Sequence, residues 1–272
     1  MASELGDILT RLAQKYERKE FLVGDPSWFM HQIEGDVNKE LLAFIASALS
    51  YGSRRQFMPK IQTLLDSIRA CGTDPDAVRR WLLTRQYEHV VPMTDDCFYR
   101  LYTCRTFNTF LRALADMAGE YGSMRGYLIS QREHDPDKMP AIDAVSHITR
   151  WFSEHGSTGV IPKDTRSSCK RVCMFLRWMV RSASPVDLGL WSDIIDRRTL
   201  IIPMDTHVVQ EAMRLGLLTS RSTSMPNAIR LSERLRDIFP DDPLRGDFAL
   251  FGLGVDDTAP SSKDFLAHHK ST

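Results

Sequence analysis

The chain lacks an excess of charge of either sign, and it lacks a long hydrophobic run. Its 272 residues include 35 Lys and Arg against 35 Asp and Glu, so the formal net charge is zero. The protein as a whole therefore does not attract a polyanion, and any affinity for nucleic acid has to come from a local basic patch. The most apolar stretch, residues 41–49, is too short to cross a bilayer, so we expect no membrane-spanning segment.

Cysteine is also scarce. The five thiols stand at positions 71, 97, 104, 169 and 173, and the first residues show no secretory pattern, which favours a reducing cytoplasm. Cys169 and Cys173 are one helical turn apart, and we interpret them as core residues because thiols are commonly buried. His207 stands two residues after Asp205, a spacing at which side chains on a helix do not face each other. No metal site is predicted.

Strand signals are almost absent, and helical periodicity runs through most of the chain. Pro and Gly separate the periodic segments from one another. With 43% hydrophobic residues, the chain can bury a sizeable core, as one large domain or as two lobes. Helices are expected over residues 5–16, 37–51, 57–70, 74–85, 95–121, 124–131, 141–155, 225–239 and 243–252, with 37–51 as the central buried helix.

Asp205 is the most informative residue of the sequence. It follows an apolar run and the helix-blocking Pro203, and the residues after it show helical spacing up to Gly216. Asp205 or Thr206 is therefore the expected N-cap of a helix. Since an N-cap residue contributes about 1 kcal/mol by itself, the simplest alternative is that Asp205 is a structural cap and nothing more.

A second informative helix is predicted over residues 166–181. Ser167 or Ser168 is its expected N-cap, and an apolar stripe along it predicts one buried face. At about 100° per residue, three cations fall within a narrow sector of the same helix, a face that would attract anions. A solvated basic stripe has the same pattern and stays open as an alternative. The three cations are Lys170, Arg177 and Arg181.

These two segments carry a resemblance to a known superfamily. Lys170 stands five residues before Phe175-Leu176-Arg177, and Asp205 opens the run Asp205-Thr206-His207. Both are similar to the catalytic motifs of the helix-hairpin-helix DNA glycosylases, in particular the 8-oxoguanine glycosylases, which share the superfamily with endonuclease III. Over residues 25–255, the chain resembles more closely an uncharacterised bacterial family, a domain of unknown function that itself resembles a divergent branch of the glycosylases. The motifs of this closer resemblance are residues 169–171, 174–181, 187–191 and 247–254.

The resemblance implies an all-α fold with two helical lobes and a cleft between them. One domain would cover residues 1–255, with the N-terminal and C-terminal helices in one lobe and roughly residues 60–200 in the other, before a flexible tail at 256–272. The implied protein is a monomer in the cytoplasm, associated with the nucleoid through double-stranded DNA that contains a damaged base or an abasic site. Because the tail has no cysteine, we expect no iron–sulfur cluster and no other cofactor.

Two departures from the superfamily pattern concern the expected site. The better-known members carry a Gly-x-Gly hairpin before the lysine, whereas residues 162–168 contain no glycine that would let the backbone approach a DNA phosphate. Lys170 and Asp205 are also 35 residues apart, a longer spacing than in endonuclease III, with residues 184–198 as the insertion. We nevertheless expect the two side chains to come close enough to serve one substrate atom.

The implied chemistry is the removal of a damaged base such as an oxidised purine. Lys170 would attack C1′ of the sugar as a neutral amine and form a Schiff base, which allows strand cleavage to follow. Asp205 would stabilise the positive charge that develops at C1′. Because an amine with the ordinary pKa of about 10.4 is mostly protonated at neutral pH, this chemistry requires burial or nearby cations, for which Arg171 and Arg177 are the candidates.

The expected DNA contacts surround this pair. Because a base inside a duplex must be extruded, Tyr51, Gln56 and Phe57 are candidates for a wedge or stacking group, although an ordinary helix end has the same pattern. A non-catalytic nucleic-acid-binding module and an RNA or nucleoside substrate stay open as alternatives. The expected contacts are Arg166, Ser168, Arg171, Arg177, Arg181, His207, Tyr51, Arg54, Arg55 and Gln56, with Lys60, Arg221 and Arg230 as further members of a basic patch.

Overall fold

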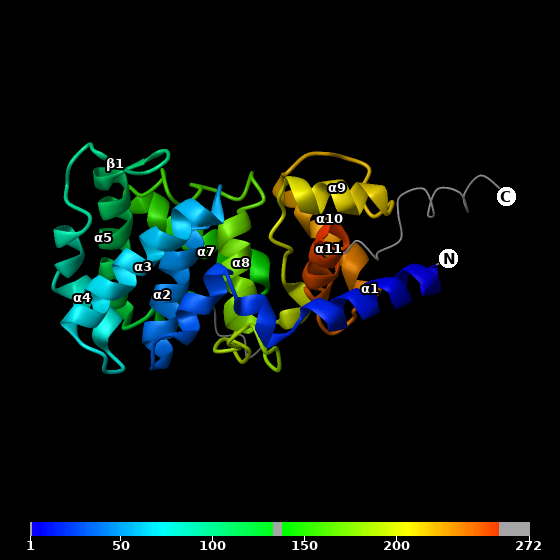
Figure 1. The fold of residues 1–272 in the computed structure, drawn as a ribbon, viewed down its shortest axis with the longest axis horizontal. Coiled ribbons are helices and arrows are strands. Elements are labelled where there is room, and N and C mark those ends of the chain that lie inside the picture. The colour runs from blue at the N-terminus through cyan, green and yellow to red at the C-terminus, as the bar shows by residue number, and fades with distance from the viewer. Residues whose placement is uncertain (1, 133–137, 256–272) are drawn as a thin grey trace.

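The computed structural model describes residues 2–132 and 138–255, and its regular structure is almost entirely helical, as expected (Figure 1). None of the helices in these residues is long and apolar enough to cross a membrane. The expected tail at 256–272 lies outside the described residues. The elements are α1 (Ala2–Tyr16), η1 (Lys19–Leu22), η2 (Pro26–His31), α2 (Asp36–Leu49), α3 (Arg54–Cys71), α4 (Ala77–Leu83), η3 (Gln86–His89), β1 (Cys97–Tyr99), β2 (Tyr102–Thr103), α5 (Cys104–Tyr121), α6 (Met124–Ser130), α7 (Ala141–Glu154), α8 (Lys170–Val180), η4 (Arg197–Thr199), α9 (Thr206–Arg214), α10 (Met225–Arg236) and α11 (Arg245–Val255), where η marks a short 3-10 helix.

The region expected as one helix over residues 95–121 begins with a short β-hairpin instead. β1 pairs antiparallel with β2, and α5 starts only after the hairpin. Arg100 takes a left-handed backbone conformation in the turn, with φ 52°. Aromatic and β-branched residues on both sides favour extended backbone, which explains why the helical pattern failed here. Thr103 then caps α5 by accepting a hydrogen bond from the amide three residues later.

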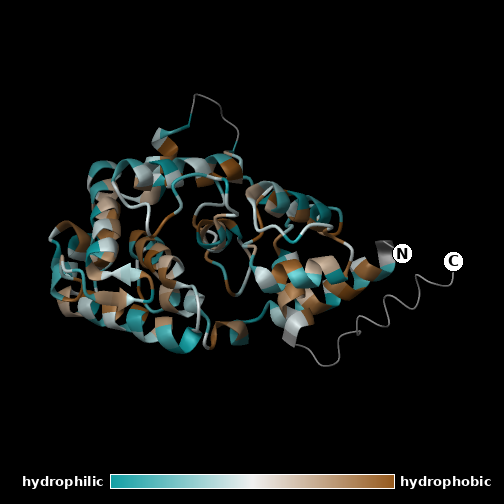
Figure 2. Cartoon of the chain, turned by 90° about the horizontal axis from the view of Figure 1, so that it is seen from above, coloured by the Kyte–Doolittle hydropathy of each residue, from teal (hydrophilic) through white to brown (hydrophobic). Residues whose placement is uncertain are grey.

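The helices gather in two groups along the long axis of the molecule. α2 to α8 lie together, and α1, α9, α10 and α11 lie together at the other end (Figure 1). α1 packs along α11, so the first and last described helices are side by side, and α9 also contacts α11. Figure 2 shows hydrophobic residues concentrated along helix sides that face neighbouring helices. The chain crosses between the two groups from α1 to α2 and again from α8 to α9.

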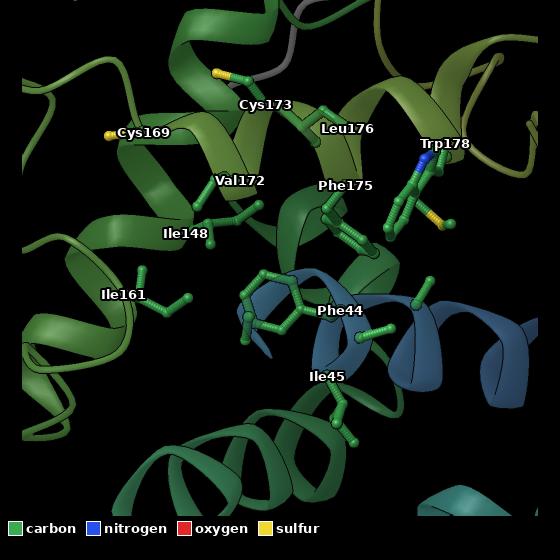
Figure 3. Close-up of a cluster of buried hydrophobic side chains, with 14 of the residues drawn as sticks. Phe44, Ile45, Ile148, Ile161, Cys169, Val172, Cys173, Phe175, Leu176 and Trp178 are labelled. Carbon is green, nitrogen blue, oxygen red and sulfur yellow. The ribbon is translucent and has the colours of Figure 1, made fainter. Parts of the chain in front are cut away.

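The core of the larger group is built around α2. Residues 41–49 are completely buried, as predicted for the central helix. The ring of Phe44 on α2 meets the ring of Phe175 on α8 edge to face, with 4.9 Å between centroids, a contact that adds about 0.5–1.5 kcal/mol to simple burial. Cys169 and Cys173 are buried in the same cluster (Figure 3), so their interpretation as core residues is confirmed.

Glu40 is a carboxylate buried within this core. It lies on α2 and accepts hydrogen bonds from the amides of Met124 and Arg125 at the start of α6, at 2.6 and 3.2 Å, and from the indole of Trp191 at 2.9 Å. Burial raises the pKa of Glu40 to about 7, against the lowering effect of these three donors. One carboxyl group thus ties together α2, α6 and the segment that follows α8.

The raised pKa of Glu40 predicts that the protein loses stability as the pH rises. The pKa in the folded protein lies above the ordinary 4.5, so the contribution of this group is fully present below that pH and is lost as the pH passes through about 7. We expect the free energy of unfolding to fall by on the order of 3 kcal/mol across this range, and expect Glu40→Gln to remove that dependence. Urea unfolding between acid and mildly alkaline pH measures it, with the exposed Glu34→Gln as control. A Glu40→Gln protein with the wild-type pH dependence contradicts the prediction.

Candidate active site

Lys170 is the first residue of α8, and the backbone conformation of the preceding residue, Cys169, fixes where this helix begins. Cys169 has a left-handed backbone conformation, with φ 46°, and occupies the N-cap position without a capping side-chain bond. The prediction of Ser167 or Ser168 as the N-cap was therefore wrong. The thiol of Cys169 donates to the carbonyl of Asp164 at 3.4 Å. A backbone conformation that usually favours glycine is thus held by a buried cysteine just before Lys170.

Asp205 is the N-cap of α9, as predicted. One carboxylate oxygen accepts a hydrogen bond from the amide of Val208 at 2.9 Å, and the other accepts from Nζ of Lys170 at 2.8 Å. The expectation that Lys170 and Asp205 come close together is therefore confirmed, although they are 35 positions apart in the sequence. The side chains remain 36% and 34% exposed, so a ligand can reach the pair from solvent.

Asp205 carries a negative charge in this arrangement. Burial alone raises the pKa of its carboxyl, but the charge and hydrogen bond of Lys170 and the amide of Val208 outweigh burial and hold the pKa below its ordinary value. The start of α9 adds the positive end of a helix dipole. The pair therefore combines a fixed carboxylate, which can stabilise positive charge, with an amine that can become a nucleophile.

The pair opens into a pocket of about 360 Å³. The ring of Phe21 meets those of Phe248 and Phe251 edge to face, with 5.0 and 5.1 Å between centroids, and the three form an apolar wall. The lining comes from α3 and α8 in the larger group of helices and from α9 and α11 in the smaller one, so the pocket lies where the groups meet. Its other charged or titratable lining residues are Asp25, Arg54, Arg177, His207, Glu211 and Asp247.

Arg177 and Arg181 are both buried. Arg181 does not line the pocket, so the prediction that it contacts DNA is wrong, whereas Arg177 lines the pocket and its contact with DNA remains a prediction. Only 5% and 1% of their surfaces are exposed. Their charged groups are instead paired with carboxylates from distant segments, which cover the face of α8 that helical spacing had assigned to DNA. The partners are Asp187 and Asp247 for Arg177, and Asp187, Asp242 and Glu17 for Arg181.

Arg181→Met is expected to destabilise the fold by about 3–5 kcal/mol, because it leaves Asp242 without its counter-charge and leaves Asp187 and Glu17 with only one arginine each, Arg177 and Arg245. Chemical denaturation measures this loss. Arg198→Met is the matched control, since Arg198 forms its ion pair with Asp196 while 65% of the arginine side chain is exposed, and we expect a change below about 1 kcal/mol. A loss for Arg181→Met no larger than for the control would mean that the buried network does not stabilise the protein.

Several of the other predicted contacts are accessible. Arg54 is ion-paired with Asp25 at 3.3 Å but keeps half of its side chain exposed, and it lines the pocket. His207 is exposed and also lines the pocket. DNA binding by these residues remains a prediction, and their positions permit it. The accessible set comprises Arg54, Arg55, Gln56, Arg166 and His207.

Ser168 and Phe57 are buried, so their predicted roles in DNA binding and base extrusion are wrong. The hydroxyl of Ser168 donates to the carbonyl of Met204 at 3.4 Å, and Phe57 belongs to the hydrophobic core. Each stands two positions after an exposed arginine, Arg166 or Arg55. The local sequence therefore did not indicate whether these two side chains point into the core or toward solvent, because that depends on where each helix begins.

Tyr51 and Arg171 are engaged within the protein. Arg171 donates to the carbonyl of Ala48 at 2.7 Å and to the hydroxyl of Tyr102, and its guanidinium carbon lies 5.3 Å from the ring centroid of Tyr51. The hydroxyl of Tyr51 donates to the carbonyl of Tyr99 at 3.2 Å. These contacts fix the β-hairpin against the start of α8. Direct contact of either side chain with DNA remains a prediction.

Leu101 is an accessible residue that the sequence patterns did not single out. It stands at the turn between β1 and β2 and is 87% exposed, the largest value among the large hydrophobic residues of the described chain. Its amide donates to the hydroxyl of Tyr51 at 3.3 Å, while the next residue, Tyr102, contacts Arg171 beside Lys170. An isolated leucine after Arg100, between strand-forming aromatics, was the signal that could have revealed it.

Comparisons with known proteins place this site within a family. Residues 25–256 match the model of a family described as "Protein of unknown function (DUF2400)", so Lys170, Asp205 and most of the pocket lie in the matched region. No curated protein and no solved structure gives a match. In the part of the chain that the structure describes, no group of three His, Cys, Asp or Glu side chains is arranged to hold a metal ion.

Proposed function

The chain belongs to the family described as "Protein of unknown function (DUF2400)", and we propose that it is a base-excision DNA glycosylase that also cleaves abasic sites. One observation carries the proposal: Lys170 and Asp205 lie 2.8 Å apart at the starts of two helices and open into one pocket. Such a pair offers a nucleophile and a fixed negative charge to the same atom. The proposed substrate is double-stranded DNA with a damaged base, such as an oxidised purine, or an abasic site.

Lys170 is the proposed nucleophile, and Asp205 is the proposed stabiliser of positive charge. The amine attacks C1′ of the damaged nucleotide as the bond to the base breaks, and the resulting Schiff base permits strand cleavage. Positive charge develops on the sugar in the transition state, and a carboxylate fixed beside it lowers that barrier. The pKa of Asp205 lies below its ordinary value, so this carboxylate is charged at neutral pH, as the role requires.

The pocket suits an extruded base. Its volume of about 360 Å³ falls in the range of about 300–1,000 Å³ that is usual for small-molecule sites. The wall formed by Phe21, Phe248 and Phe251 gives a planar ring an apolar surface, while the charged lining residues can exchange hydrogen bonds with its edge. An enzyme that acts on a base needs such a cavity, because the reacting bond is inaccessible inside a duplex.

The arrangement of the helices supports the two-lobed helix-hairpin-helix type as part of this proposal. Lys170 comes from α8, in the larger group of helices, and Asp205 comes from the start of α9, in the smaller group (Figure 1). The pocket is lined by residues of both groups, which supports a cleft between two lobes. In place of the glycines of that type, Cys169 has a left-handed backbone conformation directly before Lys170.

We assign the wedge that fills the gap left by an extruded base to Leu101 rather than to Tyr51, Gln56 or Phe57. Leu101→Ala is expected to slow base release from a damaged duplex by about tenfold, because an inserted apolar side chain offsets part of the cost of unstacking a base step. The same lesion in a single strand should react at the wild-type rate. Single-turnover kinetics measure both. Leu83→Ala, at a 41% exposed leucine on α4, is the control. Equal slowing on both substrates contradicts the wedge.

The direct test is an activity panel. Labelled duplexes bearing 8-oxoguanine, uracil, an alkylated base or an abasic site are incubated with the protein at low and moderate salt. Base release, strand cleavage and borohydride-trapped adducts are then measured. Low salt is included because the chain has no net charge, so a small basic patch should give strongly salt-sensitive binding. Salt-sensitive binding without base release, cleavage or adduct on any duplex would favour a non-catalytic nucleic-acid-binding module.

A further inference from the structure

The amine of Lys170 needs a proton acceptor other than Asp205. In an ion pair the amine carries three protons, and it must lose one before its lone pair can attack. Asp205 already accepts from the amide of Val208 at 2.9 Å and from Lys170 itself at 2.8 Å. In the proposed mechanism it must also stay negative while the sugar becomes positive. A carboxylate that already accepts two hydrogen bonds and must stay negative is a poor acceptor for the released proton.

Asp247 is a second carboxylate in the same pocket. It lies in the first turn of α11, it lines the pocket, and its side chain is 13% exposed. Its Oδ2 accepts a hydrogen bond from Arg177. Among residues 2–132 and 138–255, no group donates a hydrogen bond to its Oδ1, and that atom is not sealed in the interior. Asp247 therefore has one oxygen held in place and one oxygen free to exchange a proton.

We propose that Asp247 is the proton-transfer residue of this site, an inference that rests on the proposed function. Lys170 gives one proton to Asp247, and the amine lone pair forms a bond to C1′ as the bond from C1′ to the base breaks. The electron pair of that bond leaves with the base, and the base takes the proton from Asp247. Asp247 ends ionised, as it began, and the step needs no oxidant, reductant or other co-reactant.

The charges around Asp247 suit a group that both accepts and gives a proton. Burial and the negative charge of Asp205 raise the pKa of Asp247, whereas Arg177 and Lys170 lower it. Burial is the largest of these effects, so the pKa of Asp247 lies above its ordinary value. A carboxyl whose pKa is shifted toward neutrality transfers protons more effectively at neutral pH. The other titratable or charged groups that line this pocket are Asp25, Arg54, His207 and Glu211. Glu17, directly after α1, does not line the pocket and pairs with Arg181 and Arg245.

Asp247→Asn tests the inference on a duplex with an abasic site, where a hydroxyl on C1′ leaves as water and the damaged base need not be known. We expect the single-turnover rate of adduct formation, trapped with borohydride, to fall by about 100-fold or more. The decline of the wild-type rate toward acid pH, which reflects protonation of Asp247, should be absent in the variant. Asp247→Glu retains a carboxyl and is expected to recover that acid limb together with much of the rate.

The variant Asp187→Asn distinguishes a role of Asp247 in proton transfer from a role in holding Arg177 in place. Asp187 lies 3.4 Å from Arg177 and is not among the described residues that line the pocket. If Asp247 only supports Arg177, Asp247→Asn and Asp187→Asn should change the rate and its pH dependence in the same way. If Asp247 transfers the proton, a folded Asp187→Asn protein should keep the decline of the rate toward acid pH. If Asp187→Asn does not fold, the comparison of Asp247→Asn with Asp247→Glu decides. An Asp247→Asn protein with the wild-type rate and acid limb overturns this inference alone. A wild-type protein without any adduct overturns the proposed function and the inference with it.

Discussion

Replacing Lys170 by alanine is expected to abolish the borohydride-trapped adduct with every duplex that the wild-type protein processes. The substitution removes the nitrogen that lies 2.8 Å from Asp205 in the pocket. The fold should survive, because pairs this exposed contribute only about 0–1 kcal/mol and Asp205 keeps its hydrogen bond to Val208. A denaturing gel of labelled DNA measures the adduct, and thermal unfolding checks the fold.

Lys163→Ala is the matched control for this experiment. Lys163 is exposed, precedes the same helix and is not among the described residues that line the pocket, so the adduct should form as in the wild type. If Lys170→Ala still traps DNA at the wild-type level, another amine is the nucleophile and the assignment of Lys170 is wrong. Loss of the adduct in both variants would indicate that the lysines act through general electrostatic attraction to DNA.

Asp205→Asn is expected to slow the chemical step by about 100- to 1,000-fold while leaving the fold intact. Asparagine is as good an N-cap as aspartate, so the hydrogen bond to the amide of Val208 can persist. What is lost is the negative charge beside the sugar, and removing one preorganised stabilising group costs a factor of this size. Single-turnover base release on the best duplex of the panel measures the effect.

Asp205→Ala separates the two functions of this residue. Alanine removes both the charge and the cap, so we expect the catalytic loss of Asp205→Asn together with about 1 kcal/mol of lost stability. The pKa of Asp205 lies below its ordinary value, so its charge stabilises the fold above the ordinary carboxyl pKa, and this contribution is lost as the pH falls through the lower value. If Asp205→Asn retains the wild-type rate, Asp205 is a structural cap only.

The helical elements and the N-cap at Asp205 could be predicted from local patterns in the sequence. The period of apolar residues located the central helix, now seen as the buried stretch 41–49, because a helix inside a core must be apolar on nearly every side. Asp205 was recognisable because a cap is defined by its immediate neighbours. The proximity of Lys170 to Asp205 rested on resemblance, since no local rule brings together residues 35 positions apart.

The directions of the arginines on α8 could not be predicted in the same way. Helical spacing correctly put Arg177 and Arg181 on one face, but the same pattern describes a solvated face and a face covered by carboxylates from elsewhere in the chain. Asp242 and Asp247 are more than sixty positions away from their partners. The hairpin around Leu101 was missed for a related reason, because two very short strands interrupt a helical pattern without a Gly or Pro signal.

The packing of α11, the last described helix, against α1 determines when the pocket is completed during synthesis of the chain. A ribosome makes Lys170 and Asp205 well before it makes Phe248 and Phe251, which belong to the last described helix and complete the wall of the pocket. Until that helix has been made and has docked, the pocket beside Lys170 lacks this wall. If the proposed function is right, nascent or truncated chains that end before α11 would be unable to hold a base there.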